Sequence, residues 1–334
     1  MLPKYPGEPP RDHSKRLEQV KVLVDARLAD QRLDLALATV LTWRSRASIH
    51  RLIRAGCVKI AGREVAPSRR VRAGDTIVID IPPEARVEPG ALQAIDFPIV
   101  YEDEWMVAVD KPAGVAVHPS GRHLSGTLIH VLHERYRRPV PEHDVVPRLL
   151  HRIDIETSGV VAVGLDEQFH HLVSRQFEDR QVQKTYLAVV HGRPPHDAGV
   201  VDLPLLPDKT STVRLKLTAR AGADGLPAVT HYRRLRGNAR YSLIEVKPKT
   251  GRTHQIRVHM AALGCPLVGD KLYGADESLF LHQIAGTLSD EHRAQLVLDR
   301  HALHSHSLTF FHPMRDQEVT VTAPLPEDLL RLVP

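Results

Sequence analysis

A dense cluster of reactive side chains precedes an apolar run near the middle of the chain. The stretch "LLHRIDIETSGVVAVG", residues 149–164, places Asp154, Thr157 and Ser158 just before Gly159 and a strand-like run of valines. An aspartate in such a polar loop is most often a turn former or a helix cap. A carboxylate held there by hydrogen bonds would instead stay ionised, as a nucleophile must. From these residues alone, both interpretations of Asp154 stay open.

A second cluster, "KPKTGRTHQIRVH", lies at residues 247–259. Thr253 can cap a helix here, and His254 and Arg257, three residues apart, would share one face of that helix. One interpretation is a solvated, basic helix start. The other is that Arg257 pairs with a buried carboxylate and lowers the pKa of that carboxylate.

Two weaker signals accompany these clusters. Lys111 precedes a rigid turn in "DKPAG", residues 110–114, although this sequence is simply a good turn former. Tyr186 lies in the strand-like run "KTYLAVV", where a tyrosine either packs in the core or lines a site.

The elements that would position these residues follow a compact amino-terminal module. Residues 32–41 and 45–56 have apolar residues at helical spacing, and Gly56 provides a stop for the second helix. Two strand-like runs, "CVKIAGREV" and "GDTIVIDIP", come next. Two helices and a small sheet therefore predict a small α+β module.

Strands and helices alternate along the remainder of the chain. We expect a strand, a turn and a second strand in "WMVAVDKPAGVAVHP", a helix in "TLIHVLHERY", a buried strand in "GVVAVGL" and a helix capped by Asp166. A strand "KTYLAVVHG", a hairpin turning at Gly237 and Asn238, and a helix ended by Gly264 follow. This order predicts an α+β domain with a mostly antiparallel mixed sheet.

These patterns divide the chain into four parts. We expect a flexible, Pro-rich tail at residues 1–29, the small α+β module at 30–82, a linker rich in Pro and Gly at 83–96, and a catalytic domain at 97–334.

Positive charge is concentrated in the amino-terminal module. The chain has 45 basic and 40 acidic side chains, yet residues 44–72 hold nine basic residues and the single acid Glu64. These basic residues are Arg44, Arg46, Arg51, Arg54, Lys59, Arg63, Arg69, Arg70 and Arg72. This window has a charge of +8 and the rest of the chain −3, which indicates a polyanionic partner.

Several classes of protein are disfavoured. No apolar run approaches the roughly 18 residues of a membrane span, and the first residues lack the apolar centre of a secretion signal. Cys57 and Cys265 are far apart, and the 21 histidines do not have the spacing of a zinc site. We therefore expect a cytoplasmic protein without a metal.

The segment "HRIDIETSG", residues 151–159, resembles the motif H-R-L-D-x-x-T-S-G of the RluA-type RNA pseudouridine synthases. The resemblance covers about residues 97–325, and departures at Ile153, Ile155 and Leu226 leave the positions that carry the chemistry unchanged. Its other segments are "YEDEWMVAVDKPAGVAVHP" (101–119), "QVQKTYLAVVHG" (181–192), "TGRTHQIRVHMAALGCPLVGDKLYG" (250–274) and "LHSHSLTFFHP" (303–313). The segments "RLDLALA", "SRASIHRLIRAGCVKIAG" and "VRAGDTIVI" of the basic module resemble an S4-type RNA-binding domain.

The resemblance implies a pseudouridine synthase fold and an isomerase that detaches uracil from its ribose and rejoins it through carbon, without a cofactor. It implies that Asp154 is the catalytic carboxylate, by attack on the sugar, addition to the base or elimination. Arg257 would be its ion-pair partner, Tyr186 would stack on the flipped base, and Arg152 would fill the space that the base leaves. The other residues expected to bind substrate are His151, Thr157, Lys111, Arg252, His254 and Ile256.

The S4-like module favours large-subunit (23S) ribosomal RNA as substrate, with transfer RNA as the second candidate, and we expect a monomer without an obligate protein partner. Two other functions stay open. A non-catalytic RNA-binding or ribosome-assembly factor would be free to lose Asp154, Tyr186 and Arg257, all of which are present. A carboxylate-dependent hydrolase would need a second acid beside Asp154, for which Glu156 is the near candidate.

Overall fold

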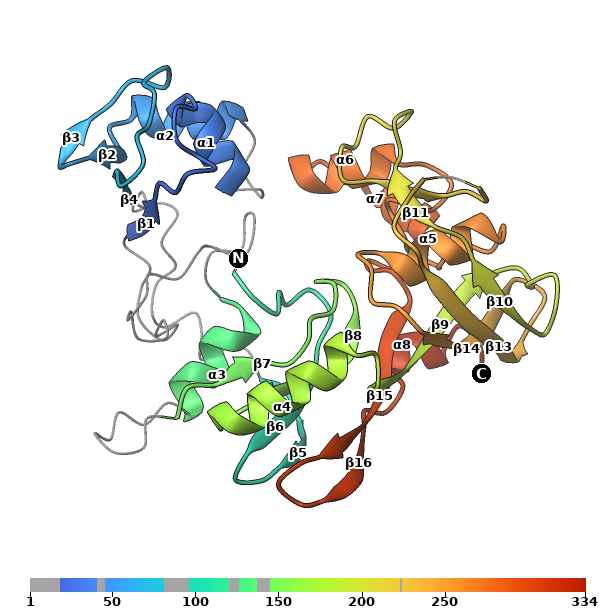
Figure 1. Ribbon diagram of the computed structural model, residues 1–334. Coiled ribbons are helices and arrows are strands. Elements are labelled where there is room, and N and C mark those ends of the chain that lie inside the picture. Colours follow the sequence, from blue (N-terminus) through green and yellow to red (C-terminus); the bar gives the residue numbers. More distant parts are fainter. Residues whose placement is uncertain (1–18, 41–45, 81–95, 120–125, 137–144, 223) are drawn as a thin grey trace. The chain divides into compact units, whose positions relative to one another are not determined.

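The computed structural model describes residues 19–40, 46–80, 96–119, 126–136, 145–222 and 224–334, and for residues 46–48 the backbone alone. The chain divides into two compact units, the first drawn from residues 1–96 and 118–146 and the second from residues 97–117 and 147–334 (Figure 1). The second unit begins at Phe97 and leaves out part of the range 97–334 that we expected for the catalytic domain. The segment 118–146, with helix α3 (Leu128–Tyr136), is grouped with the first unit instead.

The first unit contains a four-stranded antiparallel sheet with the strand order β1-β4-β2-β3. Its strands are β1 (Gln19–Leu23), β2 (Val58–Ile60), β3 (Arg63–Glu64) and β4 (Thr76–Asp80). Helices α1 (Leu33–Val40) and α2 (Arg46–Arg54) lie where the apolar spacing predicts them. Gly56 follows α2 with the positive φ of 71° that is common after a helix end.

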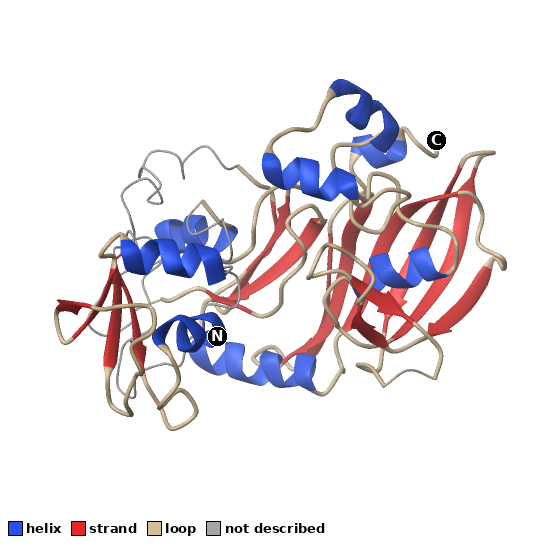
Figure 2. Ribbon diagram, turned by 90° about the horizontal axis from the view of Figure 1, so that it is seen from above, coloured by secondary structure: helices blue, strands red, loops and turns tan. Residues whose placement is uncertain are grey.

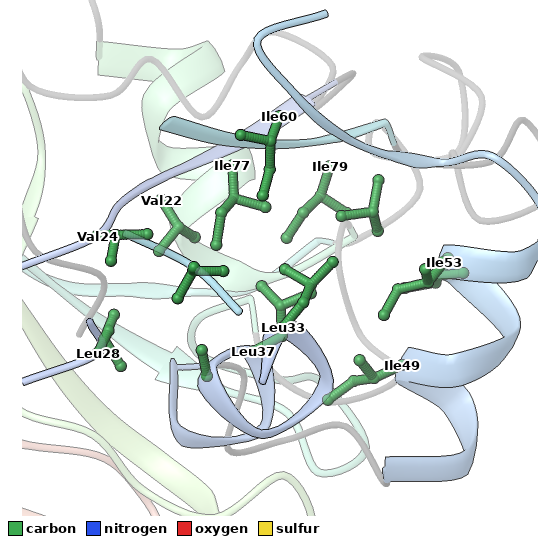
Figure 3. Close-up of a cluster of buried hydrophobic side chains, with 14 residues drawn as sticks. Val22, Val24, Leu28, Leu33, Leu37, Ile49, Ile53, Ile60, Ile77 and Ile79 are labelled. Carbon is green, nitrogen blue, oxygen red and sulfur yellow. The ribbon is translucent and has the colours of Figure 1, made fainter. Parts of the chain in front are cut away.

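An apolar core joins these two helices to the sheet. In Figure 3, Val22 and Ile77 from the strands point toward Leu33 and Leu37 of α1 and toward Ile49 of α2. Each of these five side chains is at most 1% exposed. Because the apolar stripes of both helices are used in this core, the basic residues between them are left for the surface.

The tail that we expected through residue 29 is too long. Strand β1 pairs with β4, with Val22 opposite Ile77, and Val24 and Leu28 are buried in the core. The alternation in "QVKVLV" is that of a strand with one buried face. The pattern is short and follows a charged segment directly, so we expected it to belong to the tail. The rest of the expected tail, most of the linker (residues 83–95), Arg44 and the side chain of Arg46 lie outside the described residues.

A ten-stranded mixed sheet forms the second unit (Figure 2), in the order β10-β13-β14-β9-β15-β8-β6-β5 with β16 beside β15 and β7 beside β8. Among the described strands, β15 and β8 form a parallel pair and all other pairs are antiparallel, as expected. The strands are β5 (Ile99–Glu102), β6 (Met106–Lys111), β7 (Arg148–Leu149), β8 (Ser158–Gly164), β9 (Gln183–His191), β10 (Ala198–Asp202), β13 (Val229–Gly237), β14 (Tyr241–Pro248), β15 (Leu303–His312) and β16 (Gln317–Thr322). A separate pair is formed by β11 (Leu205–Pro207) and β12 (Leu217–Ala219).

Two apolar cores support the two halves of this sheet. One contains Phe169 of α4 and Leu308 of β15, and the other contains Ile256 and Met260 of α5 and Leu303 of β15. Strand β15 therefore belongs to both halves. The helices of the unit are α4 (Glu167–Glu178), α5 (Gln255–Ala262), α6 (Ser278–Ala285), α7 (Asp290–Leu296) and α8 (Glu327–Leu330). None of the helices in the described part of the chain combines the length and apolarity that a membrane span requires.

Three local predictions are confirmed. The side chain of Asp166 accepts the N–H of Phe169 at 2.7 Å and caps α4. Strands β13 and β14 form the expected hairpin, and its turn, residues 238–240, follows directly after Gly237, the last residue of β13. Gly264 follows α5 with a φ of 76°.

The second strand expected in "WMVAVDKPAGVAVHP" is absent from the described residues, where β6 is followed by turns through residue 119. The reason is the side chain of Lys111. It donates to the carbonyl oxygens of Pro112 and Val115 at 2.8 and 2.9 Å, so it folds this segment back on itself.

The two halves of the sheet meet tightly at Gly159. It has a φ of 106°, and a Cβ at this position would overlap the backbone of Ser305, its partner in the parallel pair of β8 and β15. A glycine is required here for both reasons, since the backbone conformation and the close approach exclude a side chain.

We expect Gly159→Ala to lower the free energy of unfolding by about 3 kcal/mol, because strain in the backbone and overpacking add. The measurement is urea-induced unfolding followed by circular dichroism. The control is Gly192→Ala, at a φ of 68° with no other atom within 4 Å of the added carbon, which should cost about 1 kcal/mol. Equal losses in the two variants would contradict the steric argument.

Candidate active site

A buried arginine joins two carboxylates that are far apart in the sequence. The guanidinium of Arg257, on α5, donates to Asp270 through Nε (2.7 Å) and Nη2 (2.9 Å) and to Asp154 through Nη1 (3.2 Å). The side chains of Arg257 and Asp270 are 8% and 0% exposed, whereas that of Asp154 is 29% exposed. The ring of Tyr273 lies 5.0 Å from the guanidinium carbon. The expected contact between Asp154 and Arg257 is therefore present, and Asp154 is the carboxylate that keeps free surface.

The surroundings keep Asp154 ionised. Burial alone would raise its pKa, but the positive groups nearby outweigh burial and hold the pKa below its ordinary value. Among these groups, Arg257 is the one charged near pH 7, because burial lowers the pKa of both His254 and His301. A carboxylate in this state is a nucleophile or base and not a proton donor.

The turn that carries Asp154 is anchored through the backbone of the next residue. Lys111, at the end of β6, is fully buried, and its Nζ donates to three carbonyl oxygens, including that of Ile155 at 3.1 Å. The N–H of Gly114 donates to the same Ile155 oxygen at 2.8 Å. Burial lowers the pKa of Lys111 to about 7. Contrary to our expectation of a substrate contact, Lys111 supports the turn from inside.

The two following residues of the turn are held by side-chain contacts. Glu156 accepts hydrogen bonds from Lys271 Nζ (2.9 Å), Gln283 Nε2 (2.8 Å) and the backbone N–H of His301 (3.1 Å). The hydroxyl of Thr157, which we expected at the substrate, is buried and lies 2.7 Å from His301 Nε2. Both side chains are committed to contacts inside the protein.

Tyr186 lies on β9, half-buried, at the edge of the core around α5. Burial and the charge of Asp154 together raise the pKa of its phenol to about 12. The phenol is therefore protonated at neutral pH, and it lies within electrostatic reach of Asp154.

The start of α5 differs from the expectation that Thr253 caps it. The residue before the helix is His254, in a left-handed conformation with a φ of 56°, and it forms no side-chain cap. Gln255 instead accepts the N–H of Arg252 at 3.1 Å. The left-handed turn brings His254 Nδ1 to 2.8 Å from the hydroxyl of Tyr273. His254 therefore helps to hold the ring of Tyr273 beside the guanidinium of Arg257.

Two other residues expected at the substrate are part of the packing. The ring of His151 stacks on Phe177, with centroids 5.3 Å apart, and its Nε2 accepts the N–H of Ala162 in β8 at 3.1 Å. Burial lowers the pKa of this ring to about 3, so it is neutral. Ile256 is 6% exposed in the core around α5. Both side chains support the elements on either side of the site.

Two expected arginines lie closer to the surface. Arg152 is exposed and, among the residues that the structure describes, has neither a hydrogen-bond nor an ion-pair partner. Arg252 is half-buried, and its Nε donates to the carbonyl oxygen of Pro227 at 3.3 Å. Arg152 is therefore a free cation two residues from Asp154.

Sequence reasoning missed four residues of this site: Asp270, Tyr273, Lys271 and His301. The first three lie in "GCPLVGDKLYG", the continuation of the Arg257 motif, where the Gly-Asp pair gave a signal that we did not use. A guanidinium has five N–H donors, so a buried arginine requires more than one acceptor. His301 had no such signal, since its contacts arise from the pairing of distant strands.

The first unit presents a separate basic surface. Arg51 and Arg54 are exposed on α2, and Arg69 and Arg70 are exposed in the loop before β4. Lys59 is half-buried and pairs with a carboxylate of β4 at 2.9 Å, so part of its charge is compensated.

No group of three or more His, Cys, Asp or Glu side chains lies close enough together to hold a metal ion in the described ranges of the chain.

Two family models match this chain. The model described as RNA pseudouridylate synthase matches residues 105–262, and the S4 domain model matches residues 31–77. The first range holds Asp154, Tyr186 and Arg257, and the second holds α2 with its exposed arginines. The class of protein is thus an enzyme of the pseudouridine synthase fold that carries an S4 RNA-binding domain.

Individual relatives agree over nearly the whole chain. The protein is 37% identical to ribosomal large subunit pseudouridine synthase D of Xanthomonas campestris pv. campestris, over 97% of this chain and 93% of the relative. It is 33% identical to the uncharacterized RNA pseudouridine synthase YlyB of Bacillus subtilis, over 95% and 98%. The solved structure of human RNA Pseudouridylate Synthase Domain Containing 1 matches with a TM-score of 0.55 and 27% identity, covering 74% of this chain and 91% of that one. The chain belongs to the RluA family of RNA pseudouridine synthases, and it is an isomerase.

A buried histidine behind the site makes stability depend on pH. His304 is fully buried; its Nδ1 lies 3.0 Å from Ser158 Oγ and its Nε2 lies 3.2 Å from the carbonyl oxygen of Ala323. Burial lowers its pKa from 6.5 to about 4. As the pH falls through this window, the unfolded chain takes up a proton that the folded protein does not bind. The free energy of unfolding therefore decreases, by up to about 1.4 kcal/mol per pH unit from this ring.

We expect His304→Gln to lose less stability than the wild type between pH 6.5 and pH 4.5, because this ring no longer titrates in the unfolded chain. The measurement is urea unfolding at several pH values. His306→Gln, on the same strand but only half-buried, is the control for the loss of a histidine side chain from β15. An unchanged slope in His304→Gln would show that this ring does not contribute.

Proposed function

We propose that this protein converts specific uridines to pseudouridine in large-subunit ribosomal RNA, with Asp154 as the nucleophilic carboxylate acting on a flipped-out uridine. The observation that carries the proposal is the partly exposed Asp154 beside the buried Arg257, which is itself fixed by Asp270. This arrangement keeps one carboxylate ionised, oriented and open on one side.

The reaction requires the exchange of one bond for another at the same ribose. The N1–C1′ bond breaks, a C5–C1′ bond forms, the proton of C5 leaves and N1 gains a proton. No electrons are gained or lost overall. An ionised Asp154 can attack the sugar, add to the base or promote elimination, and each route uses a carboxylate whose charge Arg257 stabilises.

Two further residues have properties that suit this chemistry. The protonated phenol of Tyr186 offers an aromatic face for the flipped base and a group that can exchange a proton near C5. Arg152 is exposed and free of partners among the described residues, so its planar cation is available to take the place of the base in the RNA stack. Tyr186 and Arg152 thus act on the base and on the helix that it leaves.

The choice of ribosomal RNA is supported by the relatives and by the basic module. Relatives from Xanthomonas campestris and Zymomonas mobilis, 37% and 36% identical, are named ribosomal large subunit pseudouridine synthase D. The exposed arginines of α2 supply phosphate contacts that do not depend on sequence. We infer that the S4 domain contributes affinity and that the second unit selects the uridine. Action as a monomer in the cytoplasm remains a prediction.

The contacts of Glu156 argue against a hydrolase. Burial would raise the pKa of this carboxylate, but the basic groups and hydrogen-bond donors around it, Lys271 among them, outweigh burial and lower the pKa. It is therefore ionised and bound by three donors, and it is not available as a second acid beside Asp154.

We expect Asp154→Asn to reduce isomerisation by at least about a thousandfold, equal to roughly 4 kcal/mol in the activation barrier, because an amide cannot act as the nucleophile. The measurement is release of tritium from RNA transcripts labelled at C5 of uridine. RNA affinity should change by no more than about threefold, since the amide has nearly the size of the carboxylate and still fits beside Arg257.

The control for this variant is Asp197→Asn, in which an exposed carboxylate outside the site is changed; it should retain full activity. A wild-type rate for Asp154→Asn would contradict the role of Asp154. Tritium release from transfer RNA transcripts alone would contradict the proposed substrate but not the chemistry.

The role of the basic surface can be tested by changing Arg51, Arg54 and Arg69 together. We expect the triple change to Gln to weaken RNA binding and to reduce the slope of log affinity against log salt by about one for each phosphate that the variant no longer binds. The measurement is RNA binding by fluorescence anisotropy at salt concentrations from about 50 to about 300 mM.

The matched control is the triple change to Lys, which retains the charge and should keep most of the slope. An unchanged slope in the Gln variant would contradict a role of this surface in binding phosphates.

A further inference from the structure

The ring of His301 lies between two consecutive residues of the turn that carries Asp154. Its Nε2 is 2.7 Å from the hydroxyl of Thr157, and its Nδ1 is 3.5 Å from Oε2 of Glu156. The backbone N–H of His301 donates to the same oxygen of Glu156 at 3.1 Å. The ring is 2% exposed, so these contacts are made inside the protein.

The neighbours of the ring determine which nitrogen carries the proton. Burial lowers the pKa of His301 to about 4, so the ring is neutral near pH 7. The ionised carboxylate of Glu156 can only accept hydrogen bonds, which favours a proton on the nitrogen that faces it, Nδ1. Nε2 is then an acceptor, and the hydroxyl of Thr157 donates to it. Each side of the ring thus has one defined role.

This arrangement fixes the turn. The N–H of Thr157 donates to the carbonyl oxygen of Asp154 at 3.1 Å, so Thr157 closes the turn on which Asp154 stands. Without its partner the buried hydroxyl of Thr157 would lack a hydrogen bond, and that cost would favour a shift of the turn. Misplacement of a reacting carboxylate by about 1 Å is enough to cost a large part of the rate.

We propose that His301 is a positioning residue for Asp154, acting as a neutral ring that accepts the Thr157 hydroxyl through Nε2 and faces Glu156 through Nδ1. His301 does not touch the reacting atoms in this scheme. The proposal rests on the proposed function, in which Asp154 is the reacting carboxylate. His301 would restrain a side chain of the turn, that of Thr157, whereas Lys111 restrains the backbone at Ile155.

The experiment compares four variants with the wild type: His301→Gln, His301→Leu, Thr157→Val, and the double variant His301→Leu/Thr157→Val. A glutamine can accept through Oε1 and donate through Nε2, as the neutral ring does, whereas leucine can do neither. Each protein is assayed for kcat and KM by tritium release from one labelled RNA that the wild type modifies, and folding is checked by thermal melting. His306→Leu, in β15 a few residues further along the chain, is the control for loss of a histidine near this position.

We expect His301→Leu and Thr157→Val to lower kcat by about tenfold or more with KM within about twofold, because orientation is lost and RNA binding is not. His301→Gln should keep kcat within about threefold of the wild type. The double variant should be no slower than the slower single variant, since both changes remove the same hydrogen bond.

Three outcomes would overturn the proposal: wild-type kcat in a folded His301→Leu or Thr157→Val protein, equal losses in the Gln and Leu variants, or losses that multiply in the double variant. If His301→Leu does not fold, Thr157→Val and His301→Gln decide the matter on their own. All rates are taken relative to the wild type on the same RNA. Failure of the proposed substrate or of the Asp154 role would therefore appear in the wild type and in Asp154→Asn, separately from this comparison.

Discussion

The structure of the site depends on one buried guanidinium shared by two carboxylates. Arg257 contacts Asp270 through two nitrogens and Asp154 through one, so the group has one positive and two negative charges. Removing such charges from water is costly, and it is tolerated only where the hydrogen bonds are well formed. Asp270 is fully buried and also accepts the N–H groups of Leu272 and Tyr273, whereas Asp154 keeps 29% of its surface. The same arginine thus has one fully buried partner and one partly exposed partner, Asp154.

The remaining contacts around the turn follow from the need to hold a charged side chain that is left partly exposed. A short loop before a strand would ordinarily move, and within the described part of the chain the side chain of Asp154 has a single hydrogen bond, from Arg257, to limit that movement. The protein restrains the neighbours instead. Lys111 and Gly114 hold the carbonyl oxygen of Ile155, three donors hold Glu156, and His301 holds Thr157. Buried groups restrain the turn, so the carboxylate of Asp154 is held in place while it stays partly exposed.

The sequence predicted the local elements well because their signals are local. The apolar stripes of α1 and α2, the cap at Asp166 and the turn at Gly237 each depend on residues within one or two turns of chain. The contact of Asp154 with Arg257 was expected from a resemblance between whole motifs. The residue types and spacing within each motif did not by themselves predict that contact.

Contacts that depend on the topology of the sheet were not predictable in this way. His301 and Thr157 are 144 positions apart, and they meet because they lie just before β15 and β8, which pair in parallel where the two halves of the sheet meet. Nothing in the local sequence of β15 indicates that pairing. Lys111 was misread for a related reason: a lysine before a turn is usually exposed, and its burial follows from three carbonyl oxygens that converge only in the folded chain.

Arginine serves two opposite purposes in this protein, and burial decides which. Arg51 and Arg54 of α2 are exposed, and the attraction of exposed cations for phosphate is strong only in sum and is screened by salt. Arg257 is 8% exposed and its charge is met by two carboxylates at hydrogen-bonding distance, so salt screens it much less. Under the proposed function, ionic strength therefore acts on the encounter with RNA and leaves the ionisation of Asp154 nearly unchanged. The same residue type thus stands in two environments that differ in their response to salt.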